Sequence, residues 1–445
     1  MYDVSWEGGA KPSLIAPKVL EAHDRVPLRT RCHTWRYIAN VLMVGYRLFV
    51  YRNWYNFMLY YLIQMLDPQS HIQLQQDIAQ NLLANRALLD QLRAEIRPLR
   101  SNVRRIMPRT STSISLVGTD GGNNKLQFDP FIVQLVRVVD SSNNEYCLEA
   151  ITPATNLSEL SAKQFNADGT PRTALGKMMA YLDVRQLTQL SHMIRSNDDD
   201  RPISLSWVQV YRELVEWAIL FSIVREKDFG TDTIIVCDGL LRSKVFARDL
   251  FKRYLKGISE GIALHAQSHR RKIYLVGVAK HSKVLDRYRL AMVLEDVLTT
   301  DYPAYVEVPR NIEQKAYVWS EYARGNDLET DESEINKFVG GKMFFVKFGS
   351  GRRDPIWPVD IFLDQVSEAP TVLGCILADA INGFPIPFYP RCLQKAHENA
   401  ALADFDFDVL QDDIYAGLRA MLGNEADLLD VFRLQEADPA QRRYG

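Results

Sequence analysis

Apolar positions divide the chain into three zones. From about residue 10 to residue 108 they recur at helical spacing, and Pro98 and Pro108 limit the last helix of this zone. We therefore expect a helical N-terminal region over residues 1–109. Its role stays open between dimer or partner contacts and packing on the rest of the chain.

Strand and helix patterns alternate in the second zone. The expected strands cover 112–119, 131–139, 145–151, 233–237, 272–279, 342–348 and 356–363. The expected helices cover 173–196, 203–226, 241–260, 283–299 and 391–403. This order predicts an α/β fold, with a mixed sheet flanked by helices over residues 110–403. Residues 404–445 are acidic at first and then helical, and we expect them to form a tail.

Two aspartates, Asp120 and Asp238, each end an apolar run and are followed at once by glycine. An apolar strand would place the carboxylate at its C-terminal end, and the glycine lets a ligand or another backbone come close. Two such carboxylates on neighbouring strands can share a divalent cation, as in sites that cleave phosphodiesters. Asp-Gly is also common in turns, so neither copy alone indicates a site.

A third carboxylate, Glu216, lies on the narrow polar stripe of an otherwise apolar helix, together with Glu213. A buried carboxylate is costly unless a cation or hydrogen bonds compensate it. A salt bridge to Arg212 or an exposed helix edge would explain Glu216 without a site. Its position, one helix before the strand that ends in Asp238, favours a metal ligand instead.

Lys280 and His397 complete the candidate site. Lys280 follows an apolar strand expected to run parallel to the two aspartate strands, so it would lie at the same sheet edge and could hold a phosphate as a point charge. A solvated strand end is the alternative. His397 lies on a helix that begins after Pro390, where a lone histidine is more often a surface or core residue than a ligand.

Basic residues cluster in two places. Six cations lie between residues 241 and 256, which we expect to form an amphipathic helix beginning just after Asp238. Such a helix could follow a nucleic-acid backbone through phosphate contacts, although a solvated face would also explain it. Lys347 lies in the second cluster, a glycine-containing loop. The residues expected to contact DNA are Arg242, Lys244, Arg248, Lys252, Lys283, Arg352 and Arg353.

Composition restricts the alternatives. The 445 residues carry a formal net charge of -2, so a site for a polyanion must be a local patch.

The 5 cysteines include no Cys-x-x-Cys, which argues against a disulfide framework or structural zinc and predicts a cytoplasmic location. The first thirty residues lack a signal-peptide pattern. Arg47 and Arg52 interrupt the stretch 37–66, so we expect a buried or partner-facing helix there and no membrane association. The sequence contains no P-loop motif.

An ordered set of five motifs resembles the NurA nuclease family over about residues 112–403. The motifs are Asp120-Gly121, Glu216-Trp217-Ala218, Asp238-Gly239, Val276-Gly277-Val278-Ala279-Lys280 and the late Pro390, Leu393, Ala396 and His397. The resemblance implies an RNase H-like core and a carboxylate-plus-histidine set that binds manganese. It further implies a homodimer that acts on DNA ends with a hexameric HerA-type ATPase, and the missing P-loop agrees with an ATPase on another chain. The long aromatic N-terminal region and the acidic tail depart from the family pattern.

Carried over residue by residue, the resemblance assigns Asp120, Glu216, Asp238 and His397 as ligands of Mn2+ or Mg2+, and Lys280 as the cation on the scissile phosphate. Glu213 is the fallback for Glu216, and Asp360 stays outside the site.

We therefore expect a metal-dependent deoxyribonuclease. The alternatives are a catalytically inactive DNA-binding adaptor of a translocase and an RNA-directed nuclease of the same fold. Cleavage polarity, strand preference, and the choice between DNA repair and antiviral defence stay open.

Overall fold

The computed structural model describes residues 67–110, 114–128, 131–152, 154–204, 206–317, 338–401 and 404–428. The chain forms two compact units, Met1–Arg86 and Ala87–Gly445. The second unit contains the sheet and includes the last part of the N-terminal region expected over 1–109. The domain limits at 109 and 403 stay a prediction. Most of the N-terminal region and the end of the tail lie outside the described residues, including the aromatic stretch 37–66.

The described part of the first unit is helix α2 (Pro68–Ala84), which is helical as expected. The Asp67 side chain accepts a hydrogen bond from the Ser70 backbone N–H at 2.9 Å and so caps the helix. Within the described residues, no helix has both the length and the apolar character that a bilayer span requires.

In the second unit, nine strands of the described chain form one sheet, in the order β1-β7-β8-β9-β6-β5-β2-β3-β4. The strands are β1 (Arg104–Arg105), β2 (Ile114–Phe128), β3 (Phe131–Asp140), β4 (Glu145–Ile151), β5 (Asp232–Asp238), β6 (Ile273–Val278), β7 (Ala304–Glu307), β8 (Gly341–Lys347) and β9 (Ile356–Phe362). β2, β3 and β4 form an antiparallel meander, and β2, β5 and β6 are parallel. A meander followed by two parallel strands is the RNase H-like arrangement, so the predicted mixed sheet is confirmed.

Helices cover both faces of the central strands. The longer helices of this unit are α3 (Arg86–Ile96), α5 (Ala174–Leu182), α7 (Trp207–Glu226), α8 (Leu250–Leu264), α9 (Lys283–Leu294), α10 (Arg310–Tyr317), α11 (Ala369–Ala380), α12 (Arg391–Ala400) and α13 (Asp404–Leu422). The shorter ones are α4 (Leu157–Ala162) and α6 (Leu187–Leu190), with single turns η1 (Arg97–Asn102), η2 (His265–His269), η4 (Leu363–Glu368) and η5 (Gly423–Glu425).

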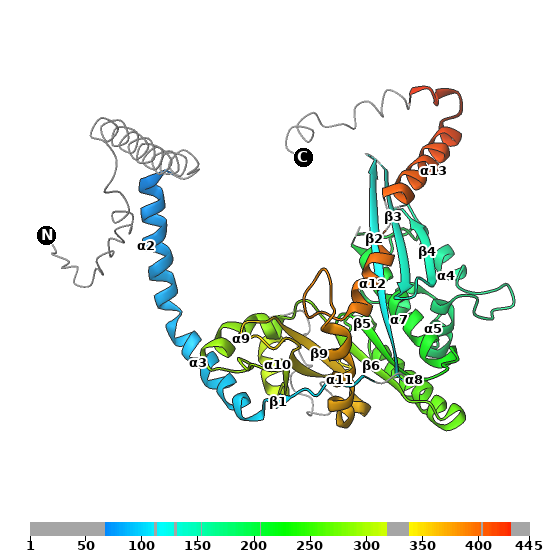
Figure 1. Cartoon of the computed structure of the whole chain (residues 1–445). Helices are drawn as coiled ribbons and strands as arrows, with labels where there is room; N and C mark the ends of the chain where they lie inside the picture. Colours follow the sequence, from blue (N-terminus) through cyan, green and yellow to red (C-terminus); the bar gives the residue numbers. More distant parts are fainter. Residues whose placement is uncertain are drawn as a thin grey trace, which may run out of the picture. The chain divides into compact units, whose positions relative to one another are not determined.

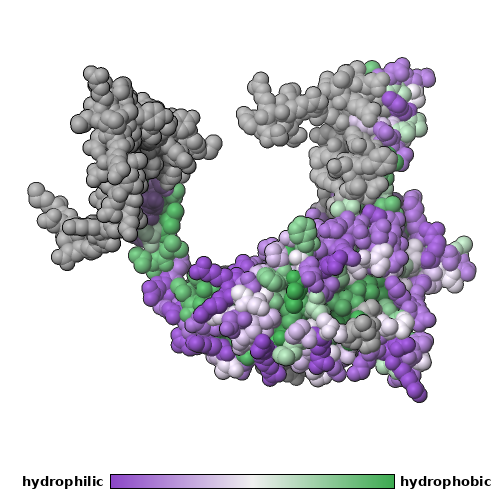
Figure 2. Space-filling model, in the orientation of Figure 1, coloured by the Kyte–Doolittle hydropathy of each residue, from purple (hydrophilic) through white to green (hydrophobic). Residues whose placement is uncertain are grey.

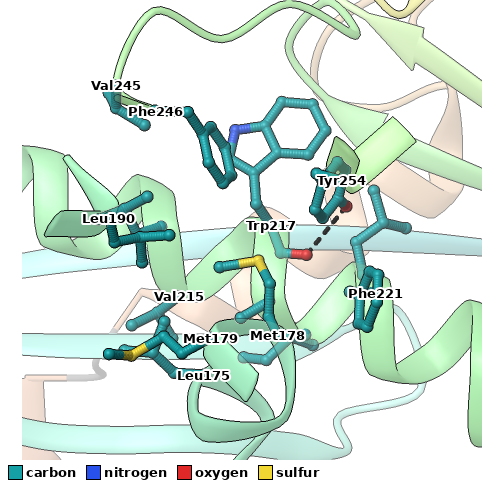
Figure 3. Close-up of a cluster of buried hydrophobic side chains, with 14 of the residues drawn as sticks. Leu175, Met178, Met179, Leu190, Val215, Trp217, Phe221, Val245, Phe246 and Tyr254 are labelled. Atoms are coloured by element: carbon teal, nitrogen blue, oxygen red, sulfur yellow. Dashed lines mark hydrogen bonds between the residues drawn. The ribbon is translucent and has the colours of Figure 1, made fainter. Parts of the chain in front are cut away.

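Alternate residues of β5 enter different cores. Ile235 packs with α5, α7 and α8, whereas Ile234 and Val236 pack with α11 and α12. A strand that is buried on both faces has an unbroken run of apolar residues, and this run is why β5 could be predicted from the sequence. Figure 3 shows the α7 side of the core, where the Tyr254 hydroxyl donates a hydrogen bond to the Trp217 carbonyl at 2.9 Å. On the face shown in Figure 2, hydrophilic residues cover most of this unit and hydrophobic residues show only in patches.

Four expected elements are wrong in their limits. The helix expected over 173–196 is two helices, α5 and α6, and the helix expected over 283–299 ends at Leu294. β2 continues nine residues beyond 119, because Asp120 to Phe128 pair with β3. The basic helix expected over 241–260 begins only at Leu250. Residues 239–249 form a loop instead, because their backbone bonds to other segments: the Gly340 N–H donates to the Leu241 carbonyl at 2.7 Å, and the Ala247 N–H donates to the Leu190 carbonyl at 2.8 Å.

Candidate active site

The two aspartates lie side by side where the parallel pairing of β2 and β5 stops. The last parallel pair is Thr119 with Cys237, and Asp120 and Asp238 come next on the two strands. Asp238 ends its strand as predicted, but Asp120 lies inside β2, which continues along β3 alone. The carboxylates therefore meet at the edge of the parallel part of the sheet.

Helix α12 brings His397 to Asp120. The helix lies against β2 and β3 (Figure 1). Its close approach depends on Gly118, since a Cβ at this position would lie 2.4 Å from the Cys392 carbonyl oxygen. Nδ1 of His397 lies 2.7 Å from Oδ2 of Asp120. Ligand atoms of Asp120, Asp238 and His397 all lie within 4.8 Å of one another, so this trio can hold one cation.

Two further groups contact Asp238. Nζ of Lys280 lies 3.2 Å from Oδ2, so the structure places the lysine beside this aspartate. The hydroxyl of Tyr389 donates a hydrogen bond to Oδ1 at 2.9 Å. Burial raises the pKa of Tyr389, and the adjacent Asp238 raises it further, so the phenol stays protonated and acts as a donor. Both carboxylate oxygens of Asp238 are thereby oriented.

Tyr389 was missed by the sequence reasoning. It is one of 20 tyrosines and follows an irregular loop, so neither spacing nor periodicity marks it. The loop is fixed by Gln394, whose side-chain amide donates to the Tyr389 carbonyl at 2.9 Å and accepts from the Ile386 N–H at 2.8 Å. A tyrosine a short distance before a helix that carries a candidate ligand is the signal that could have indicated it.

Glu216 reaches the site from α7. Side chains alternate along β2, so Gly118 and Asp120 face α12 while Gly121 faces α7. A Cβ on Gly121 would lie 2.0 Å from Oε1 of Glu216, so this glycine makes room for the carboxylate beside Asp120. Oε1 also lies 3.3 Å from Nε of Arg212. The salt bridge considered as an alternative is therefore present, and Glu216 nevertheless lies at the site.

Glu213, the fallback for Glu216, is engaged in structural contacts. Its Oε1 accepts hydrogen bonds from the Ser243 hydroxyl at 2.7 Å and from Nε1 of Trp217 at 3.3 Å. The Ser243 bond holds α7 against the loop 239–249, and the Trp217 bond lies within α7. Glu216 is therefore the better candidate of the two.

A cavity of about 290 Å³ lies against the carboxylates. It is lined by Thr119, Asp120, Val138, Arg212, Glu213, Glu216, Trp217, Ile219, Leu220, Cys237, Asp238, Gly239, Leu240, Arg242 and Lys244. Its walls come from β2, β3, α7, β5 and the loop after β5. The carboxylates thus border a partly open space that a substrate group could enter.

The charges at this site suit a divalent cation. Burial raises the pKa of Asp120, Asp238 raises it further, and the His397 contact lowers it. Burial raises the pKa of Glu216 to about 8, with Arg212 opposing the shift and Asp120 adding to it. Carboxylates that disfavour each other's ionisation would be stabilised by a cation. Manganese accepts the carboxylate and imidazole donors that Asp120, Asp238 and His397 offer, so these residues fit the metal that the resemblance implies.

The raised pKa of Glu216 predicts a pH effect on the metal-free protein. Between its ordinary value of 4.5 and about 8, the folded chain binds a proton that the unfolded chain has lost. Stability therefore falls as pH rises through this window. With EDTA present, we expect the midpoint of thermal unfolding of the wild type to fall more steeply than that of Glu216→Gln, and the two curves to run parallel above the window. Equal slopes throughout would show that Glu216 does not titrate in this way.

The predicted DNA-contacting residues differ in their exposure to solvent. The prediction that Arg242 is a surface residue is wrong, because its side chain is 5% exposed and forms ion pairs with Glu313 and Asp360. Lys347 is also buried, and its ammonium donates to the Gly351 carbonyl at 2.9 Å. Lys244 is half-buried in the wall of the cavity. The exposed members of the set are Arg248, Lys252, Lys283, Arg352 and Arg353, whose contact with DNA stays a prediction.

No protein-family model matches the sequence, and no curated protein matches it. Among solved structures, the NurA nuclease from Sulfolobus solfataricus matches at 11% identity and a TM-score of 0.40, covering 80% of this chain and 99% of that one. The chain is similar to NurA nucleases. A NurA structure bound to dAMP and manganese matches at 13% identity and a TM-score of 0.33, covering 76% and 94%. An endonuclease V from Streptomyces avermitilis matches at 13% identity and a TM-score of 0.24, covering 73% and 94%.

Because identity is low throughout, function is inferred from the geometry of the site.

Proposed function

We propose that this chain is a metal-dependent DNA nuclease that hydrolyses phosphodiester bonds. The observation that carries the proposal is the convergence of Asp120, Asp238 and His397 within 4.8 Å, with Lys280 beside them. These residues would hold one or two Mn2+ or Mg2+ ions, with Glu216 as a further carboxylate. A bound divalent ion would lower the pKa of a water and offset charge on the phosphate.

The protein's own groups have distinct roles in this proposal. The Lys280 ammonium neutralises charge on the scissile phosphate. The Tyr389 hydroxyl and Lys280 hold Asp238 in a fixed orientation, since each contacts one of its oxygens. The imidazole of His397 favours manganese over magnesium, because magnesium strongly prefers oxygen ligands.

The proposal extends to the setting of the reaction. The chain would act at DNA ends as a homodimer with a HerA-type hexameric ATPase, in DNA end processing or in defence against phage. The absence of a P-loop from the sequence supports an ATPase on another chain. Similarity to structures described as NurA and endonuclease V supports the reaction class.

The test is incubation of the purified full chain with linear and circular DNA, in Mn2+, Mg2+ or EDTA, with and without a candidate HerA-type ATPase. We expect linear DNA to be degraded with Mn2+ and to remain intact with EDTA, because the carboxylates need a cation to admit the phosphate. Equal cleavage in EDTA would contradict metal dependence. An absence of cleavage, together with no Mn2+ binding by calorimetry, would identify the chain as an adaptor. An RNA strand competing in the same assay tests the choice of nucleic acid.

A further inference from the structure

We infer that Arg212 is a phosphate-binding residue of this site, which contacts the DNA strand in the cavity. The inference rests on the proposed function. Arg212 lines the cavity together with Asp120, Glu216 and Asp238. Lys280 contacts Asp238 but does not belong to that lining. Of Arg212 and Lys280, Arg212 is therefore the cation that a group inside the cavity would meet, alongside Arg242 and Lys244.

Two contacts fix the guanidinium of Arg212. Its Nη1 donates a hydrogen bond to the Gly121 carbonyl at 3.2 Å, and its Nε lies 3.3 Å from Oε1 of Glu216. The Nε makes no hydrogen bond to the described residues. A guanidinium has five N–H donors in a rigid fork, so donors remain for a ligand after the Gly121 bond. The fork matches the oxygens of a phosphate, and the side chain is 34% exposed and therefore accessible.

The charges of the cavity give this guanidinium a function beyond its salt bridge. Four carboxylates line the cavity: Asp120, Glu213, Glu216 and Asp238. The cations that line it are Arg212, Arg242 and Lys244, and Arg242 is already paired with the buried Glu313 and Asp360. A phosphodiester that enters the cavity would be repelled by the carboxylates unless the other cations face it. A partly exposed pair between Arg212 and Glu216, spaced i to i+4, contributes little to stability, so the salt bridge alone does not account for a guanidinium in the wall of this cavity.

The test is fluorescence anisotropy of a labelled single-stranded DNA oligonucleotide with the full chain in EDTA, over a range of salt concentrations. We expect Arg212→Gln to weaken binding about tenfold or more, and to reduce the slope of log affinity against log salt by about 0.7. Arg212→Lys should keep the slope but lose part of the affinity, because it retains the charge and loses the fork. The matched control is Arg225→Gln on the same helix, where Arg225 is 31% exposed and pairs with Glu260.

A purely structural role would lower the unfolding temperature of Arg212→Gln and leave its affinity and salt slope at wild-type values, and that result overturns the inference. A wild-type chain that binds no oligonucleotide overturns it as well. Failure of the proposed function is a separate outcome: the chain would then bind DNA through Arg212 yet cut none with Mn2+.

Discussion

Asp120→Asn is expected to lower Mn2+-dependent DNA cleavage by at least about a hundredfold while the chain stays folded. Even residues that only support a metal ligand typically cost about 10–100-fold when they are lost, and Asp120 would be a ligand itself. The substitution keeps the shape of the side chain and removes its charge. The pKa of Asp120 is raised by burial and by Asp238, so loss of the charge relieves repulsion and should not destabilise the metal-free protein.

The measurements are initial rates on linear DNA, Mn2+ titration by calorimetry and thermal unfolding in EDTA. Asp168→Asn is a suitable control, because Asp168 is an exposed loop residue whose carboxylate accepts hydrogen bonds from Thr170. The control should cut at the wild-type rate. If Asp120→Asn also cuts at the wild-type rate, Asp120 is not a residue of the catalytic site.

Arg242→Met is expected to destabilise the fold by about 3–5 kcal/mol, because it leaves the buried Asp360 without its cation and leaves the buried Glu313 with only the partly exposed Arg310. Nε and Nη2 of Arg242 contact Asp360 at 2.7 and 2.8 Å, and Nη1 contacts Glu313 at 2.7 Å. The side chains of Asp360 and Glu313 are 0% and 2% exposed. Denaturant unfolding monitored by circular dichroism measures the loss.

Arg310→Met provides the comparison for Arg242. Arg310 also contacts Glu313, at 3.1 Å, but its side chain is 26% exposed, so its removal should cost less. Adding Asp360→Asn and Glu313→Gln to Arg242→Met should recover part of the stability, since the stranded charges are then gone. Wild-type stability of the single variant would mean that water or other groups solvate both carboxylates.

Strands β3, β4 and β5 were close to their predicted limits because their apolar runs are continuous or alternate cleanly. Residues of the candidate site could also be predicted from the sequence where they come at the end of an apolar strand. Asp238 and Lys280 both come at the ends of apolar strands, and parallel strands bring such ends together. Asp120 was found for the same reason, although its strand continues beyond it.

The structure of the loop 239–249 could not be predicted from the local sequence pattern. Its basic residues repeat at helical spacing, yet the chain there is held by long-range partners that override propensity. Arg242 is the clearest case, since its surface-like spacing gave no sign of Glu313 and Asp360. Tyr389 was invisible for a related reason, because its position depends on the contacts of Gln394 rather than on any repeat.

The close packing of α12 on Gly118 also has a consequence during synthesis. Asp120 and His397 are separated by 277 positions in the chain. A polypeptide still emerging from the ribosome holds both aspartates long before the imidazole is translated. The proposed metal centre is therefore incomplete throughout that period, and under the proposed function the nascent chain would stay inert toward nucleic acid until α12 has docked.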